Sequence, residues 1–180
     1  MSVLGELQPN KVFKYFEEIC SIPHGSRNLQ QISDYLVDFA KAHELKYRQD
    51  EDLNVIIWKD GSKGYEASEP VILQGHMDMV AVKEADCDKD MEKEGLDLEI
   101  NGDYISAKGT SLGGDDGIAV AYTLAVLDDE EMAHPPIEAI FTVNEEIGML
   151  GAATIDVSDL KGRLFMNMDS EDEGVFTAVS

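Results

Sequence analysis

The N-terminal quarter of the chain carries two stretches in which apolar side chains recur every three or four positions. That spacing places them along one face of a helix, so it predicts two amphipathic helices. The first is expected to begin near Asn10, a suitable N-cap, and to end at about Ser21. The second is expected to follow Ser26 and to continue to about His43.

Beyond these helices, shorter apolar segments predict strands. Residues 71–76 form a continuous apolar run, which is typical of a strand buried on both faces of an α/β sheet. Residues 96–107 alternate around an Asn101-Gly102 turn and predict a peripheral hairpin. A further helix, rich in small residues, is expected over 113–128. The other expected strands are residues 46–49, 54–58, 137–143, 164–168 and 175–178, of which 137–143 and 164–168 are expected to be buried.

This alternation of helices and apolar strands predicts the fold class. It is typical of a sheet with helices on both faces, a three-layer α/β/α sandwich. A length of 180 residues suits a single domain, and a hydrophobic content of 43% is enough for a packed core. Because Ser180 comes directly after a strand-like segment, we expect an incomplete sandwich in which residues 1–180 form the N-terminal portion of a larger domain.

The chain is strongly acidic, since 14 basic residues against 37 acidic ones give a formal net charge of −23. Such a surface repels the phosphate backbone of nucleic acids and anionic lipid headgroups. Neither a nucleic acid nor a membrane surface is therefore expected as a partner. A metal site uses only a few acids, so most of the acidic excess is expected to lie on the solvated surface.

The cysteines and the N-terminus indicate a cellular location. Cys20 and Cys87 have neither the spacing of a metal-binding knuckle nor the density of a disulfide scaffold, and Cys20 is expected to pack on the apolar face of the first helix. The N-terminus lacks the apolar core of a signal peptide. The longest apolar stretch, residues 117–127, is too short to span a bilayer. The expected location is cytoplasmic.

The most informative motif, Gly75-His76-Met77-Asp78, ends the first buried strand. Residues two apart on a strand point to the same face, so the imidazole of His76 and the carboxylate of Asp78 are expected side by side. Asp78 can then hold one ring nitrogen of His76 while the other nitrogen binds a metal ion. Taken alone, the motif fits equally a surface histidine that is paired with an acid.

Three further acidic motifs stand at the ends of expected elements. Asp115 and Asp116 lie in a glycine-flanked turn at a helix start, where a carboxylate can bridge two cations or simply cap the helix. Glu145 and Glu146 follow a strand. One of them can bind metal while the other accepts a proton, although an exposed acidic pair is the commoner alternative. Asp169 follows another apolar strand.

Several of these motifs share one position in the predicted fold, the carboxyl end of a strand. Open α/β sheets bind ligands outside the carboxyl ends of their strands. Because His76, Glu145 and Asp169 all arrive at such ends, their joint occurrence favours one hydrolytic divalent-metal site. The residues alone do not decide which of Glu145 and Glu146 binds metal and which acts as a base.

In order and context, these motifs resemble the co-catalytic zinc aminopeptidase and dipeptidase family often called M20, and within it the bacterial aminoacyl-histidine (Xaa-His) dipeptidases. The resemblance implies a metallo-dipeptidase that hydrolyses small, unblocked dipeptides, with Xaa-His dipeptides as one candidate substrate. It extends through nearly the whole chain. The segments that carry it are residues 19–24, 74–80, 108–118, 144–152 and 168–174.

The family pattern also implies roles within the site. It implies two divalent metal ions, with Glu145 as the general base and Asp78 as the residue that orients the histidine. It further implies a cis peptide between Asp115 and Asp116. Zn²⁺ is the expected metal, with Mn²⁺ or Co²⁺ as alternatives for oxygen-rich ligands. The implied ligands are His76 and Asp169 on one ion, Glu146 on the other, and Asp115 on both.

The sequence departs from the family in one respect. Members carry a smaller lid domain inserted in the catalytic domain, and a returning segment that supplies a further histidine ligand. Neither is present up to Ser180, so we expect the lid after residue 180 and little or no activity from the chain by itself. A homodimer is one option for the full-length parent. The alternatives are a relative that cleaves another amide, such as a tripeptide or an N-acyl amino acid, and a non-catalytic binding module.

Overall fold

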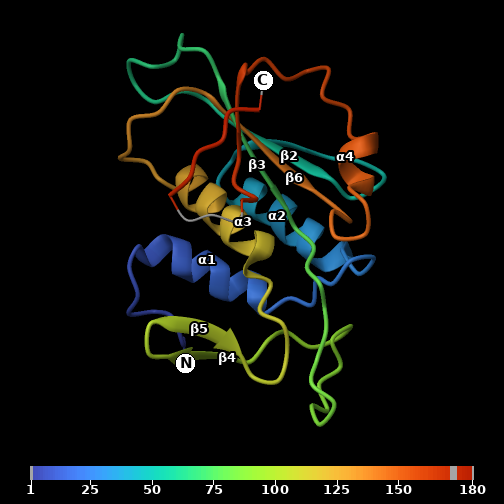
Figure 1. Ribbon diagram of the computed structural model, residues 1–180. Coiled ribbons are helices and arrows are strands. Elements are labelled where there is room, and N and C mark those ends of the chain that lie inside the picture. The colour runs from blue at the N-terminus through green and yellow to red at the C-terminus, as the bar shows by residue number, and fades with distance from the viewer. Residues whose placement is uncertain (1, 171–173, 180) are drawn as a thin grey trace.

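The computed structural model describes residues 2–170 and 174–179, and an α/β sheet lies at its centre (Figure 1). The strands are β1 (Lys46–Gln49), β2 (Val55–Lys59), β3 (Val71–His76), β4 (Leu98–Asn101), β5 (Tyr104–Ala107), β6 (Ile137–Thr142) and β7 (Leu164–Asn167). The main sheet has the order β1–β2–β6–β3–β7. Within it β3 runs parallel to β6 and β7, whereas β2 is antiparallel to β1 and β6. A separate sheet pairs β4 with β5.

Helices flank the main sheet, which confirms the expected α/β class. They are α1 (Asn10–Cys20), α2 (Gln30–Ala42), α3 (Gly114–Leu127) and the short α4 (Leu150–Thr154). α2 lies on β1 and β2, α3 lies on β3 and β6, and α1 packs on α3 (Figure 1). Their apolar side chains share one core with alternate strand residues such as Val55, Ile57 and Phe141.

The opposite face of the sheet is also buried at its centre. Ile56, Ile72 and Ile140 alternate with the residues that face α2 and α3, and each is less than 8% exposed. The carboxylate of Glu138 on this face accepts hydrogen bonds from the backbone N–H groups of Lys161 and Gly162. These bonds hold the segment after α4 against the sheet.

The helix boundaries differ from the expected ones at two N-termini. Asn10 is the first residue of α1 rather than its N-cap; Pro9 takes the cap position, and the Asn10 amide donates instead to the carbonyl of Gly5 at 3.0 Å. α2 begins at Gln30, later than the expected start after Ser26. Arg27 has a φ of +71°, outside the right-handed helical region, so the helix cannot include it.

The C-terminal strands are less buried than expected. β7 forms, but the expectation of a buried strand is wrong, since Leu164 is 60% exposed and Phe165 is 53% exposed. β7 is an edge strand whose sheet partner is β3, and α3 makes its sheet contacts with β3 and β6 instead. The strand expected over 175–178 is also wrong: within the described residues 174–179 the backbone pairs with no strand.

Two antiparallel hairpins are present, and β4–β5 is the one expected over residues 96–107. The β1–β2 pair is antiparallel, with Gln49 opposite Val55. In the β4–β5 hairpin Asn101 pairs with Tyr104, so the two turn residues are Gly102 and Asp103 rather than the predicted pair. Gly102 has a φ of +63°, and glycine adopts this left-handed conformation without steric cost.

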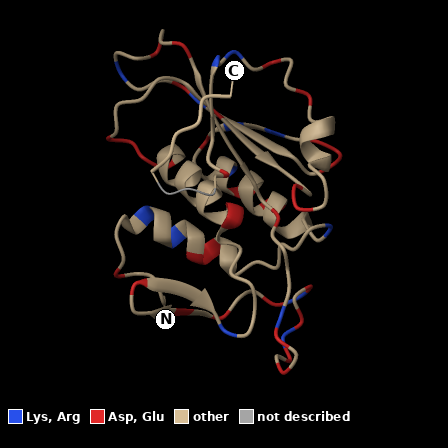
Figure 2. Cartoon of the chain, in the orientation of Figure 1, with Lys and Arg blue, Asp and Glu red and all other residues tan. Residues whose placement is uncertain are grey.

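The charged residues lie mainly at the surface, as predicted. Figure 2 shows acidic residues on loops and helices throughout the fold. Among the residues that the structure describes, the buried acids are Asp78, Asp116 and Glu138. Cys20 is 1% exposed and belongs to the core, as its place on the helix predicted. Within residues 2–170 and 174–179, no helix combines the length and hydropathy that crossing a bilayer requires.

Candidate metal centre

His76 lies at the carboxyl end of β3, where its side chain is 1% exposed. Its Nε2 atom lies 3.0 Å from Oδ1 of Asp115. On the other side of the ring, Nδ1 lies 3.0 Å from the carbonyl oxygen of Asp78 and 3.6 Å from its carboxylate. The predicted neighbourhood of His76 and Asp78 is therefore present, and it fixes the orientation of the imidazole.

Asp78 is itself held from two directions. Its Oδ1 accepts a hydrogen bond from the backbone N–H of Glu145 at 3.0 Å, and its Oδ2 accepts one from the Ser26 hydroxyl at 2.8 Å. Burial alone would raise the pKa of Asp78, but its hydrogen bonds from His76, Glu145 and Ser26 keep that pKa below its ordinary value. Asp78 is thus an ionised, fixed carboxylate that links β3 to the loop after β6.

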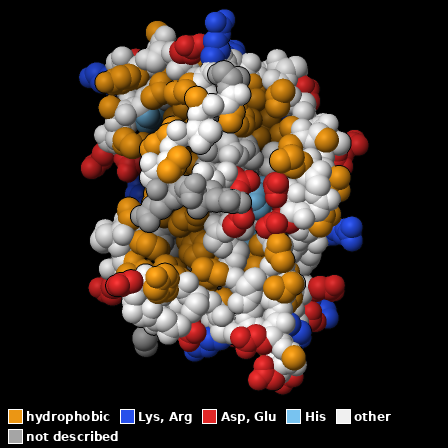
Figure 3. Space-filling model, viewed as in Figure 1, with side chains coloured by type: hydrophobic (Ala, Val, Ile, Leu, Met, Phe, Trp, Pro, Cys, Tyr) orange, Lys and Arg blue, Asp and Glu red, His pale blue; other side chains and the backbone are white. Residues whose placement is uncertain are grey.

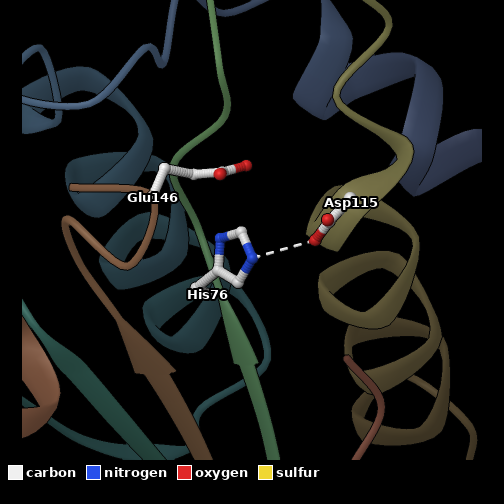
Figure 4. Close-up of side chains that lie close together, drawn as sticks. All are labelled: His76, Asp115 and Glu146. Carbon is white, nitrogen blue, oxygen red and sulfur yellow. Dashed lines mark hydrogen bonds and ion pairs between the residues drawn. The ribbon is translucent and has the colours of Figure 1, made fainter. Parts of the chain in front are cut away.

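The two aspartates at the start of α3 play different parts. The peptide between Asp115 and Asp116 is cis, as the resemblance implied. Asp116 is 2% exposed, and its Oδ2 accepts a hydrogen bond from the backbone N–H of His76 at 3.1 Å. Asp115 is 71% exposed and turns its carboxylate toward the imidazole (Figure 4). Gly75 permits the close approach of Asp116 to the backbone of His76, because a Cβ at position 75 would lie 2.8 Å from Oδ2 of Asp116.

The loop that carries Glu145 and Glu146 begins where β6 ends at Thr142. Asn144 has a φ of +54° and turns the chain, so the two glutamates do not alternate as they would on a strand. Oε2 of Glu145 lies 3.9 Å from Nε2 of His76. The side chain of Glu146 extends past the ring of the same histidine (Figure 4), and their ligand atoms lie within 4.8 Å of each other. The structure therefore brings both carboxylates to one site.

Burial and charge shift the protonation of this cluster. Burial alone would lower the pKa of His76, but the hydrogen bond that its ring donates to Asp78 and the charges of Asp116 and Asp78 outweigh it and raise that pKa to about 9. Burial raises the pKa of Asp116 to about 7, against the opposing effect of His76. The pKa of Glu146 is raised by burial and by the charge of Asp115. A metal ion has to compete with the proton on His76, because a ligating imidazole is neutral.

Within residues 2–170 and 174–179, two overlapping groups of side chains have the geometry to hold a metal ion. In each group, one ligand atom per residue lies within 4.8 Å of the others. Figure 3 shows acidic side chains gathered around a histidine on the same face of the molecule. One imidazole with several carboxylates suits Zn²⁺, and Mn²⁺ or Co²⁺ accepts similar donors. The groups are His76 with Asp115 and Glu146, and His76 with Glu145 and Asp169.

All six predicted site residues therefore belong to one cluster. Both glutamates occur in a group that can hold a metal, so this geometry does not separate a ligand from a base. No sequence pattern marked Ser26 or the backbone contact of Asp116 as supports for the site. The one sequence feature that pointed to Asp116 was its position next to Asp115. Nothing in the sequence marked the pairing of Ser26 with Asp78, which lies 52 residues away.

The loop that carries Glu145 and Glu146 runs from Val143 to Gly151. The buried amide of Asn54, which is 1% exposed, closes its base. Its Oδ1 accepts a hydrogen bond from the Val143 N–H at 3.1 Å, and its Nδ2 donates to Asp50 at 2.8 Å. The Gly151 N–H donates to the Val143 carbonyl at 2.9 Å, which brings both ends of the loop together. A Cβ on Gly151 would collide with the Asn54 side chain and would lie 2.6 Å from the Val143 carbonyl oxygen.

Gly151→Ala is therefore expected to destabilise the chain by roughly 2–4 kcal/mol, because the methyl group overpacks this site and breaks buried hydrogen bonds. Urea denaturation gives the change in the free energy of unfolding. Ala152→Ser, at an exposed position of the same helix, is the matched control and should change it by less than about 0.5 kcal/mol. Equal values for the two variants would contradict this account of the loop.

Comparison with known proteins identifies relatives that are peptidases. The cytosol non-specific dipeptidase of Escherichia coli is 40% identical over 174 residues, which cover 97% of this chain and 36% of that protein. The crystal structure of aminoacylhistidine dipeptidase from Vibrio alginolyticus matches with a TM-score of 0.92 and 40% identity, over 95% of this chain and 35% of that one. The chain is homologous to these dipeptidases. The resemblance that the motifs indicated is confirmed.

Other comparisons add less. A tripeptidase from Staphylococcus aureus matches with a TM-score of 0.74 at 23% identity, over 90% of this chain and 43% of that one, and this supports the fold alone. No protein-family model matches the chain. The chain spans about a third of the length of the dipeptidases it matches.

Proposed function

We propose that this chain provides the metal-binding part of a cytoplasmic, M20-type metallo-dipeptidase that hydrolyses small unblocked dipeptides. The observation that carries the proposal is the cluster of one buried imidazole and several carboxylates at the ends of β3, β6 and β7 and the start of α3. The dipeptidase relatives, each 40% identical to the chain, support the same reaction class.

The donor set fits two divalent metal ions, with Zn²⁺ as the proposed metal. When bound, the ions would lower the pKa of water and polarise the scissile carbonyl. We assign His76 and Asp169 to one ion, Glu146 to the other, and Asp115 to both. The exposed carboxylate of Asp115, 3.0 Å from the histidine, is free to turn toward either side of the cluster.

Glu145 is the proposed general base. Its backbone N–H is fixed by Asp78 while its carboxylate stays 27% exposed, so the side chain is anchored and still open to solvent. It accepts a proton from the attacking water and delivers it to the leaving amine. Asp78 acts through His76: it holds Nδ1 and leaves Nε2 directed at Asp115.

The experiment that tests this function measures hydrolysis of a dipeptide panel by an intact polypeptide that contains the chain and has the length of its relatives. We expect turnover of unblocked dipeptides that EDTA removes and Zn²⁺ restores. Tripeptides and N-acyl amino acids should be cleaved more slowly. Faster cleavage of an N-acyl amino acid than of any dipeptide would overturn the substrate class.

The same assay tests what this chain can do alone. Because it spans about a third of its relatives' length, we propose that a lid domain follows residue 180 and that turnover requires it. The 180-residue chain should give no turnover above the chelated background. Robust, EDTA-sensitive hydrolysis by this chain would contradict that proposal while leaving the metal site intact.

A further inference from the structure

Asn144, which stands immediately before the two glutamates of the site, combines an unusual backbone conformation with a long-range contact. Its φ of +54° lies in the left-handed region, which few residues other than glycine adopt. Its side-chain Oδ1 accepts a hydrogen bond from the backbone N–H of Arg27 at 2.8 Å, across 117 positions of sequence. This bond joins the loop that carries the glutamates to the connection between α1 and α2.

The segment around Arg27 is itself fixed, so it can serve as an anchor. The Ser26 N–H donates to the Met79 carbonyl at 3.2 Å, which ties the segment to the chain just beyond β3. The Asn28 N–H donates to the Gly25 carbonyl at 2.8 Å and closes a tight turn around Arg27. The N–H that Asn144 accepts is therefore presented from a well-defined position.

The metal-facing end of the loop is held to other segments at two consecutive residues. The Glu145 N–H donates to Asp78, and Asn144 accepts from Arg27. One hydrogen bond leaves a segment free to rotate about it, whereas two bonds to different segments fix its orientation. Glu146 depends on this, because in the part of the chain that the structure describes neither its N–H nor its carboxylate has a hydrogen-bond partner. The backbone that precedes it decides where its carboxylate can reach.

We propose that Asn144 is a positioning residue of the metal centre, whose amide fixes the orientation in which Glu145 and Glu146 face the site. Asparagine suits this task because it tolerates the left-handed conformation and also supplies an acceptor, whereas glycine offers the conformation alone. A cavity of about 1100 Å³ beside the site is lined by Glu146 but not by Asn144, so Asn144 acts through its neighbours rather than on a ligand. This inference rests on the proposed function, since it assigns a support to the proposed base and to a proposed metal ligand.

The test uses an intact polypeptide titrated with Co²⁺, whose visible absorption reports the geometry of its ligands. Asn144→Gly keeps the left-handed conformation and removes the acceptor; the bond is exposed to solvent, so the variant should remain folded. It should change the Co²⁺ spectrum, weaken Co²⁺ affinity about tenfold and lower kcat about tenfold, with KM close to the wild-type value. Asn144→Asp keeps an accepting oxygen and should recover most of the spectrum, the affinity and kcat.

Met149→Gly is the matched control. Met149 lies in the same loop with a φ of +56° and is 59% exposed, so the substitution adds the same backbone freedom without removing a side-chain hydrogen bond. Its spectrum, affinity and kcat should match the wild type. Wild-type values in Asn144→Gly would overturn the inference, and so would an Asn144→Asp or Met149→Gly variant as impaired as Asn144→Gly.

Failure of the proposed function has a different signature in this experiment. It would appear in the unsubstituted polypeptide, as a lack of Co²⁺ binding or of dipeptide hydrolysis that EDTA removes. Either result would overturn the proposed function and the role of Asn144 with it. A wild-type polypeptide that binds Co²⁺ and hydrolyses dipeptides leaves the variants to decide the role of Asn144 alone.

Discussion

His76→Ala is expected to abolish tight zinc binding by this chain. His76 is the one residue common to both groups that can hold a metal, and it is the only nitrogen donor in either. Removal of an imidazole from the shared position should weaken affinity by on the order of 100-fold or more, beyond what loss of an outer-sphere partner costs. The measurement is the number of zinc ions retained per chain after loading and desalting.

Two further variants make this result specific. His43→Ala removes a partly exposed histidine at the end of α2, away from the cluster, and should retain zinc like the wild type. Asp115→Asn changes an exposed carboxylate, so it should lower zinc retention without the core perturbation that replacement of a buried side chain brings. Circular dichroism shows whether each variant is folded. Equal retention by His76→Ala and wild type would mean that the cluster is not the metal site.

The local sequence predicted most of the elements but not their burial at the sheet edge. The apolar run over Val71–His76 and the fully buried β6 behaved as their composition predicted, because they have strands on both sides and a helix above them. β7 has similar composition, yet Leu164 and Phe165 remain exposed. An apolar strand sequence predicts pairing, whereas burial depends on which elements pack on it, and strand order is not encoded locally.

The candidate site was predictable to the level of its residue types and strand ends. The two-residue period of a strand predicted that His76 and Asp78 lie together. They do, although β3 ends at His76 and Asp78 is positioned instead by its bonds to Ser26 and the Glu145 N–H. The supports of the site were not predictable in this way. Ser26 and Asn54 reach the site region through contacts between segments far apart in sequence, and each is a common polar residue without a motif. Such contacts follow from the packed fold alone.

Because Glu145 is the proposed base and Glu146 a proposed metal ligand, replacing Glu145 should have a second large effect, on kcat. Glu145→Gln in an intact polypeptide is expected to lower kcat by on the order of 10²–10⁴-fold, because an amide cannot accept the proton of the attacking water. Zinc retention should stay at the wild-type level. The bond between the Glu145 N–H and Asp78 uses the backbone, so the substitution leaves the loop anchored. Kinetics and metal analysis on the same preparation provide both values.

Glu146→Gln is the control, since it has the same chemistry one residue away. As the proposed ligand of the second ion, Glu146 should lose zinc when it is changed, and excess Zn²⁺ in the assay should restore part of its activity. Excess zinc should do nothing for Glu145→Gln. The reverse pattern, with zinc lost from Glu145→Gln and retained by Glu146→Gln, would exchange the two roles, because both glutamates lie in groups that can hold a metal. Unchanged activity in both variants would remove the loop from the mechanism.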